Sequence, residues 1–201
     1  MMPEFKEPYH GRPITFGEIG CFMSHYNIWN DIIDKKYSKV VVFEDDVRFE
    51  PYFRSKMQRL LAELETLKLE WDLVFLGRKI LGSMTEPWLE KSEMLLHVNY
   101  TYWTLGYMLS NAGAQKLVLE EPLSKIVPVD EYLPIMYDRH PKEDWKSFYR
   151  NRDLKAFSVQ PLFVYPTHYV GEDGYLSDTE DSLVMQVPSC ESHNCDQVSV
   201  L

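Results

Sequence analysis

The sequence has no apolar run long enough to cross a membrane. No window approaches the roughly 20 consecutive apolar residues that a transmembrane helix requires. The segment from Met1 to Glu7 has neither the basic region nor the apolar region of a signal peptide. We therefore expect no membrane span, and we expect that the chain as written does not direct itself into a secretory compartment.

Cysteine is scarce, and the three residues present do not form a recognisable metal motif. Cys21 lies in an apolar run, and we expect it to be a buried small hydrophobe. Cys190 and Cys195 have four residues between them, including His193, and this spacing matches no standard zinc motif. We therefore predict no structural zinc site.

Lysine and arginine are absent from residues 156–201, whereas seven acidic residues fall there, and the formal net charge of the chain is −10. A nucleic-acid-binding protein needs a basic face to neutralise phosphates, so this class is excluded. The acidic block is compatible with binding a cationic polymer or a divalent metal. A solvated acidic tail is the simpler alternative.

Several familiar nucleotide and catalytic motifs are also missing. The sequence contains no Gly-x-Gly-x-x-Gly and no Gly-x4-Gly-Lys-Ser/Thr, which excludes a Rossmann fingerprint and a P-loop. Gly-x-Ser-x-Gly and His-Glu-x-x-His are absent as well. If the protein binds a nucleotide, it must handle the phosphates in another way.

What is present predicts one α/β domain in a chain of 201 residues, 45% of them hydrophobic. A capping box at Thr15 and Glu18 starts a helix, and apolar residues at helical spacing predict a second helix over 57–67. Strands are expected over 40–43, 72–76, 100–109 and 156–164, the first covered on both faces. The pattern predicts a sheet flanked by helices over residues 1–182 and a tail over 183–201.

Three consecutive acids, Glu44, Asp45 and Asp46, follow the first predicted strand directly. Ligands collect at the carboxyl ends of strands in α/β sheets. Strand alternation would point Glu44 and Asp46 the same way. Carboxylate oxygens suit Mn²⁺ or Mg²⁺, and such a cation can neutralise a departing diphosphate. The alternative is an exposed acidic turn.

A second acidic pair, Asp130 and Glu131, follows a proline-containing loop. One of the two carboxylates could deprotonate an acceptor hydroxyl as a general base. Alternatively, the pair starts a helix, where acidic side chains meet the helix dipole favourably.

Four more side chains are candidates for the same site. His168 could complete a metal shell or bind phosphate, or it could be a hydrogen-bonded structural histidine. Arg78 could offset diphosphate charge, or it could be part of a solvated basic pair. Tyr102 and Trp103 could stack on a sugar, or they could be ordinary core aromatics.

Taken in order, segments over about residues 8–182 resemble the procollagen galactosyltransferases of glycosyltransferase family 25. The segments that carry the resemblance are Gly17-Glu18-Ile19-Gly20-Cys21-Phe22-Met23-Ser24-His25-Tyr26, Phe43-Glu44-Asp45-Asp46-Val47-Arg48-Phe49-Glu50, Leu76-Gly77-Arg78-Lys79, Tyr102-Trp103-Thr104-Leu105-Gly106-Tyr107, Pro122-Leu123-Ser124-Lys125, Pro128-Val129-Asp130-Glu131, Tyr165-Pro166-Thr167-His168-Tyr169 and Gly174-Tyr175-Leu176-Ser177-Asp178-Thr179-Glu180.

The resemblance implies a GT-A-like, Rossmann-like fold with a mostly parallel sheet, and a site that uses Mn²⁺ and UDP-galactose. It implies transfer of galactose, with inversion, to the hydroxylysine hydroxyls of collagen or procollagen chains in the endoplasmic reticulum lumen. Glu44, Asp45 and Asp46 match the metal and nucleotide motif of the family. Asp130 and Glu131 match a second acidic motif, from which we would draw the base.

Family members are larger, and the strand expected to hold the uridine ahead of Thr15 has no counterpart here. Nor does the chain carry a KDEL-type retention signal. We therefore expect a truncated domain that is inactive by itself. Two other functions remain open: a non-catalytic cell-adhesion or binding relative of the same family, and a divalent-metal hydrolase built on the acidic triplet. Turnover of UDP-galactose with a hydroxylysine peptide would separate the transferase from the non-catalytic relative, and hydrolysis without acceptor would indicate the hydrolase.

Overall fold

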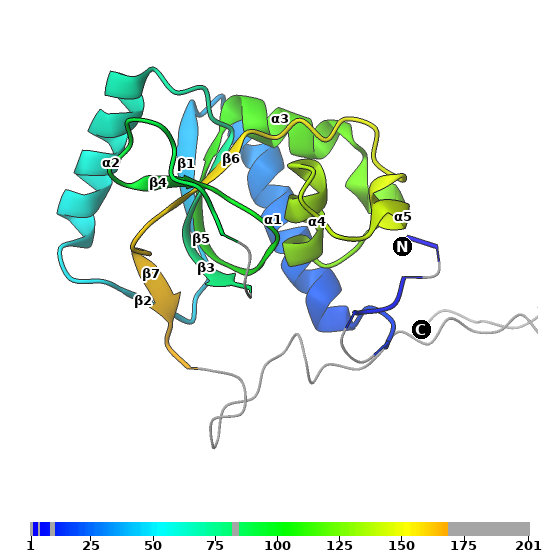
Figure 1. Cartoon of the computed structure of the whole chain (residues 1–201). Helices are drawn as coiled ribbons and strands as arrows, with labels where there is room; N and C mark the ends of the chain where they lie inside the picture. Colours follow the sequence, from blue (N-terminus) through cyan, green and yellow to red (C-terminus); the bar gives the residue numbers. More distant parts are fainter. Residues whose placement is uncertain (1, 4, 9–10, 82–84, 169–201) are drawn as a thin grey trace, which may run out of the picture.

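A computed structural model describes residues 2–3, 5–8, 11–81 and 85–168 of the chain (Figure 1). The predicted tail over 183–201 and the last part of the predicted domain lie outside the described residues. The elements in chain order are α1 (Phe16–Asp34), β1 (Lys39–Phe43), β2 (Val47–Phe49), α2 (Phe53–Leu67), β3 (Leu73–Ile80), β4 (Leu95–His97), β5 (Thr101–Ser110), α3 (Asn111–Leu119), the 3-10 helix η1 (Pro122–Ser124), α4 (Val129–Met136), α5 (Glu143–Lys146), β6 (Ala156–Val159) and β7 (Val164–Pro166).

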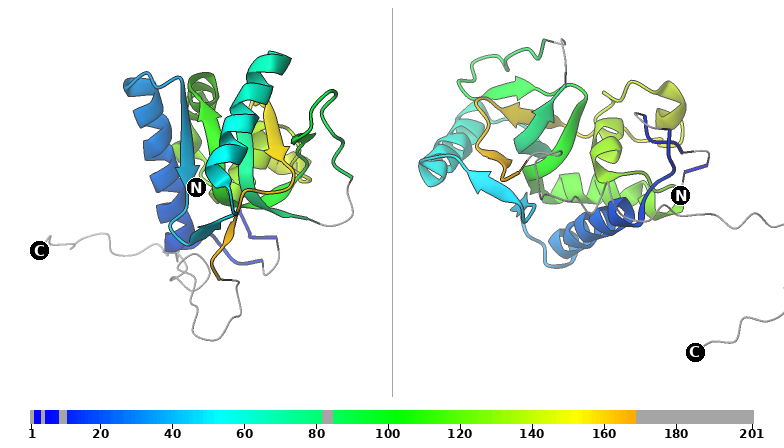
Figure 2. Two further views of the ribbon diagram at one scale, coloured as in Figure 1. Left: turned by 90° about the vertical axis from the view of Figure 1, so that its left-hand side faces the viewer. Right: turned by 90° about the horizontal axis from the view of Figure 1, so that it is seen from below.

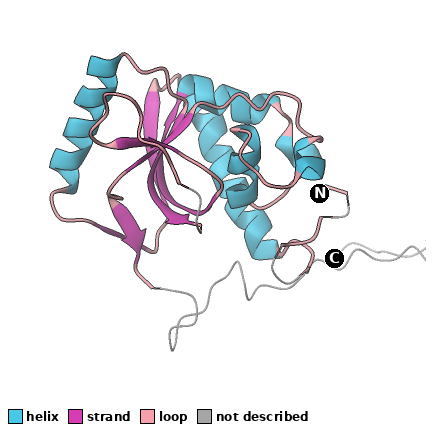
Figure 3. Ribbon diagram, viewed as in Figure 1, coloured by secondary structure: helices cyan, strands magenta, loops and turns pink. Residues whose placement is uncertain are grey.

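The main sheet has five strands in the order β1-β5-β3-β6-β4, and β2 pairs with β7 in a separate two-stranded ladder (Figure 3). The predicted α/β class is confirmed, and the sheet with its flanking helices is consistent with a GT-A-like domain. Three strands of the predicted mostly parallel sheet do run in one direction, but most neighbouring strands pair antiparallel. Strands β1, β3 and β6 run the same way, but β5 lies antiparallel between β1 and β3, so β3–β6 is the one parallel pair in the described sheet.

Helices cover both faces of this sheet, as two views show (Figures 1 and 2). Helix α2 packs on one face through Leu60 and Leu64, in a core that includes Val74 and Met108. Helices α1, α3 and α4 pack on the other face. None of the described helices is long and apolar enough to span a membrane. The result is a three-layer arrangement with one hydrophobic core on each side of the sheet.

The capping box predicted at the start of α1 is confirmed. The Thr15 side chain accepts a hydrogen bond from the Glu18 backbone N–H at 3.2 Å, and the Glu18 carboxylate accepts one from the Thr15 N–H at 2.7 Å. The Arg12 guanidinium donates to the same carboxylate at 2.9 Å. These bonds satisfy donors that a helix start otherwise leaves unpaired, and they fix the first turn of α1.

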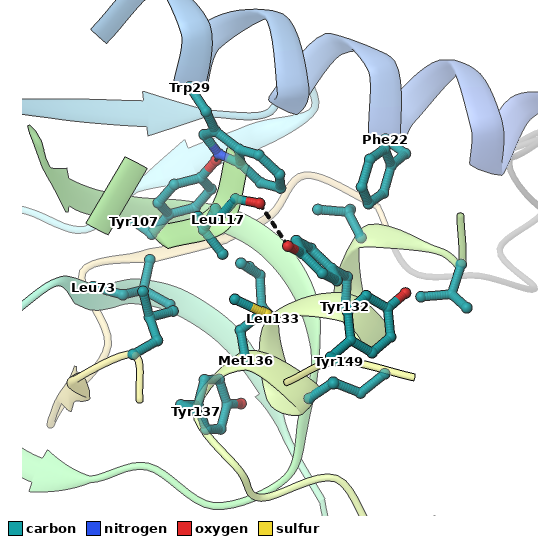
Figure 4. Close-up of a cluster of buried hydrophobic side chains, with 14 of the residues drawn as sticks. Phe22, Trp29, Leu73, Tyr107, Leu117, Tyr132, Leu133, Met136, Tyr137 and Tyr149 are labelled. Atoms are coloured by element: carbon teal, nitrogen blue, oxygen red, sulfur yellow. Dashed lines mark hydrogen bonds between the residues drawn. The ribbon is translucent and has the colours of Figure 1, made fainter. Parts of the chain in front are cut away.

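Aromatic side chains from three elements fill the core between α1, α4 and the sheet (Figure 4). Tyr132 of α4 lies against Phe22 and Trp29 of α1, with ring centroids 5.5 and 5.8 Å apart. Its hydroxyl donates to the Leu117 carbonyl oxygen at 2.6 Å, as the dashed line marks. A buried tyrosine needs such a partner, because an unsatisfied hydroxyl costs stability. This packing fixes the position of α4 relative to α1.

Two expectations about individual strands are wrong. The strand predicted over 40–43 to be covered on both faces is β1, which lies at the sheet edge, and Val41 is 38% exposed. Strand β4 lies outside every predicted strand, because three residues are too few to show alternation. The strand predicted over 156–164 is divided at Pro161, since β6 ends at Val159 and β7 begins at Val164.

Two helical glycines provide a matched test of how closely α3 approaches β3. A Cβ on Gly113 would lie 2.7 Å from the Asp72 carbonyl oxygen, whereas a Cβ on Gly20 of α1 would meet nothing within 4 Å. Alanine normally stabilises a helix interior, so Gly20→Ala should raise the free energy of unfolding by up to about 1 kcal/mol. Gly113→Ala should lower it by about 1–3 kcal/mol through overpacking. Denaturant unfolding measures both, and a stabilising Gly113→Ala would contradict the described packing.

Candidate functional site

The three acids after β1 do not continue the strand. Glu44 follows the last strand residue, and Asp45 and Asp46 form the turn that leads into β2. The alternation that would align Glu44 with Asp46 therefore does not apply. Glu44 is half-buried, and its carboxylate accepts a hydrogen bond from the Thr104 hydroxyl of β5. Asp45 is exposed, so the triplet presents its carboxylates in different surroundings.

His168 lies beside the same turn. Strands β2 and β7 pair antiparallel with Val47 opposite Pro166, and the Thr167 N–H donates to the Asp46 carbonyl oxygen at 2.7 Å. The ladder therefore brings exposed His168 to the end of β7 that is next to Asp45 and Asp46. The structure places these predicted site residues in one region.

A buried histidine that the sequence analysis did not select faces Glu44 from α1. The Nε2 atom of His25 lies 3.9 Å from Glu44 Oε1. Its Nδ1 atom shares a hydrogen bond of 2.7 Å with the hydroxyl of Tyr107 on β5, and Trp29 Nε1 donates to the same hydroxyl oxygen at 3.1 Å. The four-residue spacing of His25 and Trp29 on one helix face was the available signal, but nothing local pointed to Tyr107.

Cys21 lies one turn before His25 on α1 and is half-buried. Its sulfur, a ring nitrogen of His25 and a carboxylate oxygen of Glu44 all lie within 4.8 Å of one another. Among the described residues, this is the one group of three or more such ligand atoms at that spacing. Burial, followed by the charge of Glu44, raises the pKa of the Cys21 thiol to about 12. The prediction of a small buried hydrophobe therefore misses its polar surroundings.

The two acids of the second motif have different environments. Asp130, in the first turn of α4, is partly buried and lies near enough to Glu44 for their charges to interact. Burial, then the charges of Glu131 and Glu44, raises the pKa of Asp130 to about 8. The carboxylate of Asp130 therefore belongs to the same charged region as the end of β1.

Glu131 instead points into the protein and is 2% exposed. Its carboxylate accepts hydrogen bonds from the hydroxyls of Tyr100 and Tyr102, each at 2.7 Å, and pairs with His140 Nε2 at 2.8 Å. The Lys142 backbone N–H donates to His140 Nδ1 at 3.1 Å, which leaves Nε2 to carry the proton toward Glu131. These partners engage both oxygens of Glu131, whereas Asp130 is the member of the pair whose pKa is raised by the charge of Glu44.

The predicted diphosphate ligand Arg78 is enclosed. Its guanidinium donates to Glu86 at 2.9 Å, to Ser158 at 2.7 Å and to Thr101 at 3.3 Å, and its side chain is fully buried. The alternative of a solvated basic pair does not hold for this residue. The geometry therefore supports a structural ion pair with Glu86.

The two predicted stacking aromatics differ from each other. The Tyr102 hydroxyl donates to Glu131, and its ring is buried. Trp103 is half-buried and has a backbone φ of 63°, a left-handed conformation that costs energy for a residue with a side chain. Lys79 Nζ lies 4.9 Å from the centroid of the Trp103 ring. The strain lies one residue before Thr104, the hydrogen-bond partner of Glu44.

Comparison with known proteins gives consistent matches. The family model described as "Glycosyltransferase family 25 (LPS biosynthesis protein)" matches residues 1–133. "Procollagen galactosyltransferase 1-A" of Xenopus laevis is 54% identical over 186 residues, which cover 92% of this chain and 30% of that protein. "Glycosyltransferase 25 family member" of Anopheles gambiae is 52% identical over 187 residues, 93% of this chain and 31% of that protein.

A human relative, "Procollagen galactosyltransferase 2", is 50% identical over 188 residues, which cover 92% of this chain and 30% of that protein. The chain thus spans about 30% of the length of the curated relatives it matches.

The raised pKa of Asp130 makes a prediction about stability. An acid whose pKa is higher in the folded state binds its proton more tightly there than in the unfolded state. The folded state therefore loses stability as the pH rises from about 4, the ordinary pKa of Asp, to about 8, the raised pKa of Asp130. Asp130→Asn removes the carboxylate and with it this loss of stability. The variant should therefore be more stable than the unchanged protein, and the difference should grow as the pH rises from about 4 to about 8. Thermal unfolding in chelator at several pH values measures the difference. A difference that does not change with pH would contradict the described electrostatics.

Proposed function

The chain belongs to glycosyltransferase family 25, and we propose that it forms part of the catalytic domain of a galactosyltransferase. The proposed reaction moves galactose from UDP-galactose to hydroxylysine hydroxyls of collagen-type chains, with inversion. The observation that carries the proposal is the proximity of Glu44 and Asp130, from the end of β1 and the start of α4. The printed names of relatives that are 50–54% identical support the choice of donor and acceptor.

The donor set at the end of β1 has the right chemistry for a hard cation. We propose that Glu44, Asp45 and Asp46 hold Mn²⁺ or Mg²⁺, with His168 as a further ligand, because oxygen-rich sets suit these ions. Their side chains would have to turn towards one another, since no three of their ligand atoms lie within 4.8 Å of one another in the described structure. When bound, the cation would offset the negative charge of the UDP diphosphate. The Thr104 hydroxyl donates a hydrogen bond that keeps the Glu44 carboxylate oriented, as hydrogen bonds to ligating carboxylates do at metal sites.

Asp130 is the proposed general base. In an inverting transfer, the acceptor oxygen attacks the anomeric carbon from the face opposite the leaving UDP, and the base removes the hydroxyl proton as the new bond forms. Its raised pKa makes Asp130 a stronger proton acceptor than an ordinary aspartate. Glu131 acts through structure, since its bonds to Tyr100, Tyr102 and His140 hold the first turn of α4 in place.

Trp103 is the proposed contact for the donor sugar. Backbone strain of the kind that Trp103 carries is concentrated at functional sites, where surrounding structure holds it. An indole ring also offers a flat apolar face for a sugar ring. Tyr102 and Arg78 enter the proposal as supports of the site, because their polar atoms bond to Glu131 and Glu86.

The metal assignment predicts a large effect of a single amide substitution. In the protein that carries this chain, Asp46→Asn should abolish nearly all galactose transfer to a hydroxylysine peptide, because it removes a ligand charge while the fold is retained. Asp34→Asn changes an exposed acid at the end of α1 and is the matched control. Calorimetry should show UDP binding that is weakened by chelator and restored by Mn²⁺. Near-normal transfer by Asp46→Asn would remove Asp46 from the site.

The base assignment predicts a kinetic defect for the amide variant of Asp130 and a stability defect for that of Glu131. Asp130→Asn should lower kcat by about 10²–10⁴-fold with little change in the KM for UDP-galactose, since base catalysis acts in the transition state. Glu131→Gln should instead lower the free energy of unfolding by about 1–3 kcal/mol, because an amide mismatches three donors. Steady-state kinetics and denaturant unfolding separate the two. If both variants only raise the donor KM, the base lies elsewhere.

A further inference from the structure

We propose that Cys21, His25 and Glu44 form a second metal site, suited to a Zn²⁺-type cation and distinct in chemistry from the carboxylate set at the turn after β1. Zn²⁺ binds sulfur, nitrogen and oxygen at about 2.0–2.3 Å, so tetrahedral ligands lie about 3.3–3.7 Å from one another. His25 Nε2 and Glu44 Oε1 are 3.9 Å apart, and all three ligand atoms are within 4.8 Å of one another. Small side-chain rotations would therefore close the site.

Two ligands of this group already have the outer partners that metal ligands require. His25 Nδ1 is bonded to the Tyr107 hydroxyl, which leaves Nε2 as the nitrogen directed at Glu44. The Tyr107 oxygen can accept from both His25 Nδ1–H and Trp29 Nε1–H, which fixes the imidazole ring. Thr104 orients the Glu44 carboxylate in the same way. Ligating histidines and carboxylates are typically held by such hydrogen bonds.

The donor chemistry selects the class of cation. One sulfur and one imidazole nitrogen favour Zn²⁺ or Co²⁺, whereas Mn²⁺ and Mg²⁺ prefer oxygen. The carboxylates of Glu18 and Asp130 also act electrostatically on Cys21. They add negative charge around the three ligands, which favours binding of a cation there. The cation itself would stabilise the thiolate, because it would displace the thiol proton. Cys21 and His25 are four residues apart on one helix, so the helix itself places both side chains on one face.

The two sites share Glu44, so their occupants compete. Zn²⁺ bound to Cys21 and His25 would hold the Glu44 carboxylate and remove it from the set that we assign to Mn²⁺ or Mg²⁺. Zn²⁺ should therefore inhibit transfer, and a chelator should restore it. This consequence rests on the proposed function, whereas the site itself does not, because metal binding can be measured without turnover.

The test is a Co²⁺ titration of the 201-residue chain with Cys190→Ser and Cys195→Ser, which leaves Cys21 as the one thiol in the sequence. We expect a near-ultraviolet thiolate-to-cobalt absorption band and intense tetrahedral bands in the visible, which Zn²⁺ displaces. Cys21→Ser should abolish the thiolate band, with circular dichroism confirming an unchanged fold. Asp45→Asn, which alters an exposed member of the carboxylate set at the turn after β1, should retain the thiolate band.

A second measurement leaves all three ligands intact. Zn²⁺ should slow alkylation of Cys21 at least about tenfold if the thiolate is bound, while Mg²⁺ should not. Absence of the thiolate band in the parent, or its persistence in Cys21→Ser, would overturn the proposal. So would alkylation at the same rate with and without Zn²⁺. None of these results depends on galactose transfer, so failure of this site and failure of the proposed function can be told apart.

Discussion

The antiparallel insertion of β5 between β1 and β3 is the constraint on which the candidate site depends. This strand pairs along both sides, and three of its side chains hold separate parts of the site. Tyr107 binds His25 of α1, Thr104 binds Glu44 after β1, and Tyr102 binds Glu131 of α4. The left-handed backbone at Trp103 and the shifts in the β3–β5 register interrupt the alternation of β5. One ten-residue strand can therefore bond to a helix start, a strand end and an aromatic core.

The adjacent acids of α4, Asp130 and Glu131, show how two carboxylates of the same charge can have different surroundings. Glu131 gives up water but gains hydrogen bonds to two tyrosines and a histidine, so its burial is compensated. Asp130 gives up water near two other carboxylates, and burial followed by the charges of Glu131 and Glu44 raises its pKa. A carboxylate held in this way destabilises the folded state and is a stronger base, a combination often found where stability is traded for function.

The same concentration of negative charge explains why cations dominate the proposed chemistry. Glu44, Asp130 and Glu18 all act on the thiol of Cys21, and the turn after β1 adds Asp45 and Asp46. The enclosed Arg78 is paired with Glu86 and does not offset this charge. A region built in this way favours a divalent ion. In the two proposed sites, the ion that binds would depend on whether Glu44 pairs with the oxygen atoms of the turn or with the sulfur and nitrogen atoms of α1.

The sequence by itself determined features that depend on near neighbours. These are the capping box of α1, the apolar stripe of α2 and the acidic triplet at the end of a strand. Only the tertiary structure decided the antiparallel insertion of β5, the burial of Arg78 and the different surroundings of Asp130 and Glu131. The physical reason is distance along the chain. Caps and periodic stripes join residues a few positions apart, whereas Glu44 meets Thr104 across 60 residues and His25 meets Tyr107 across 82.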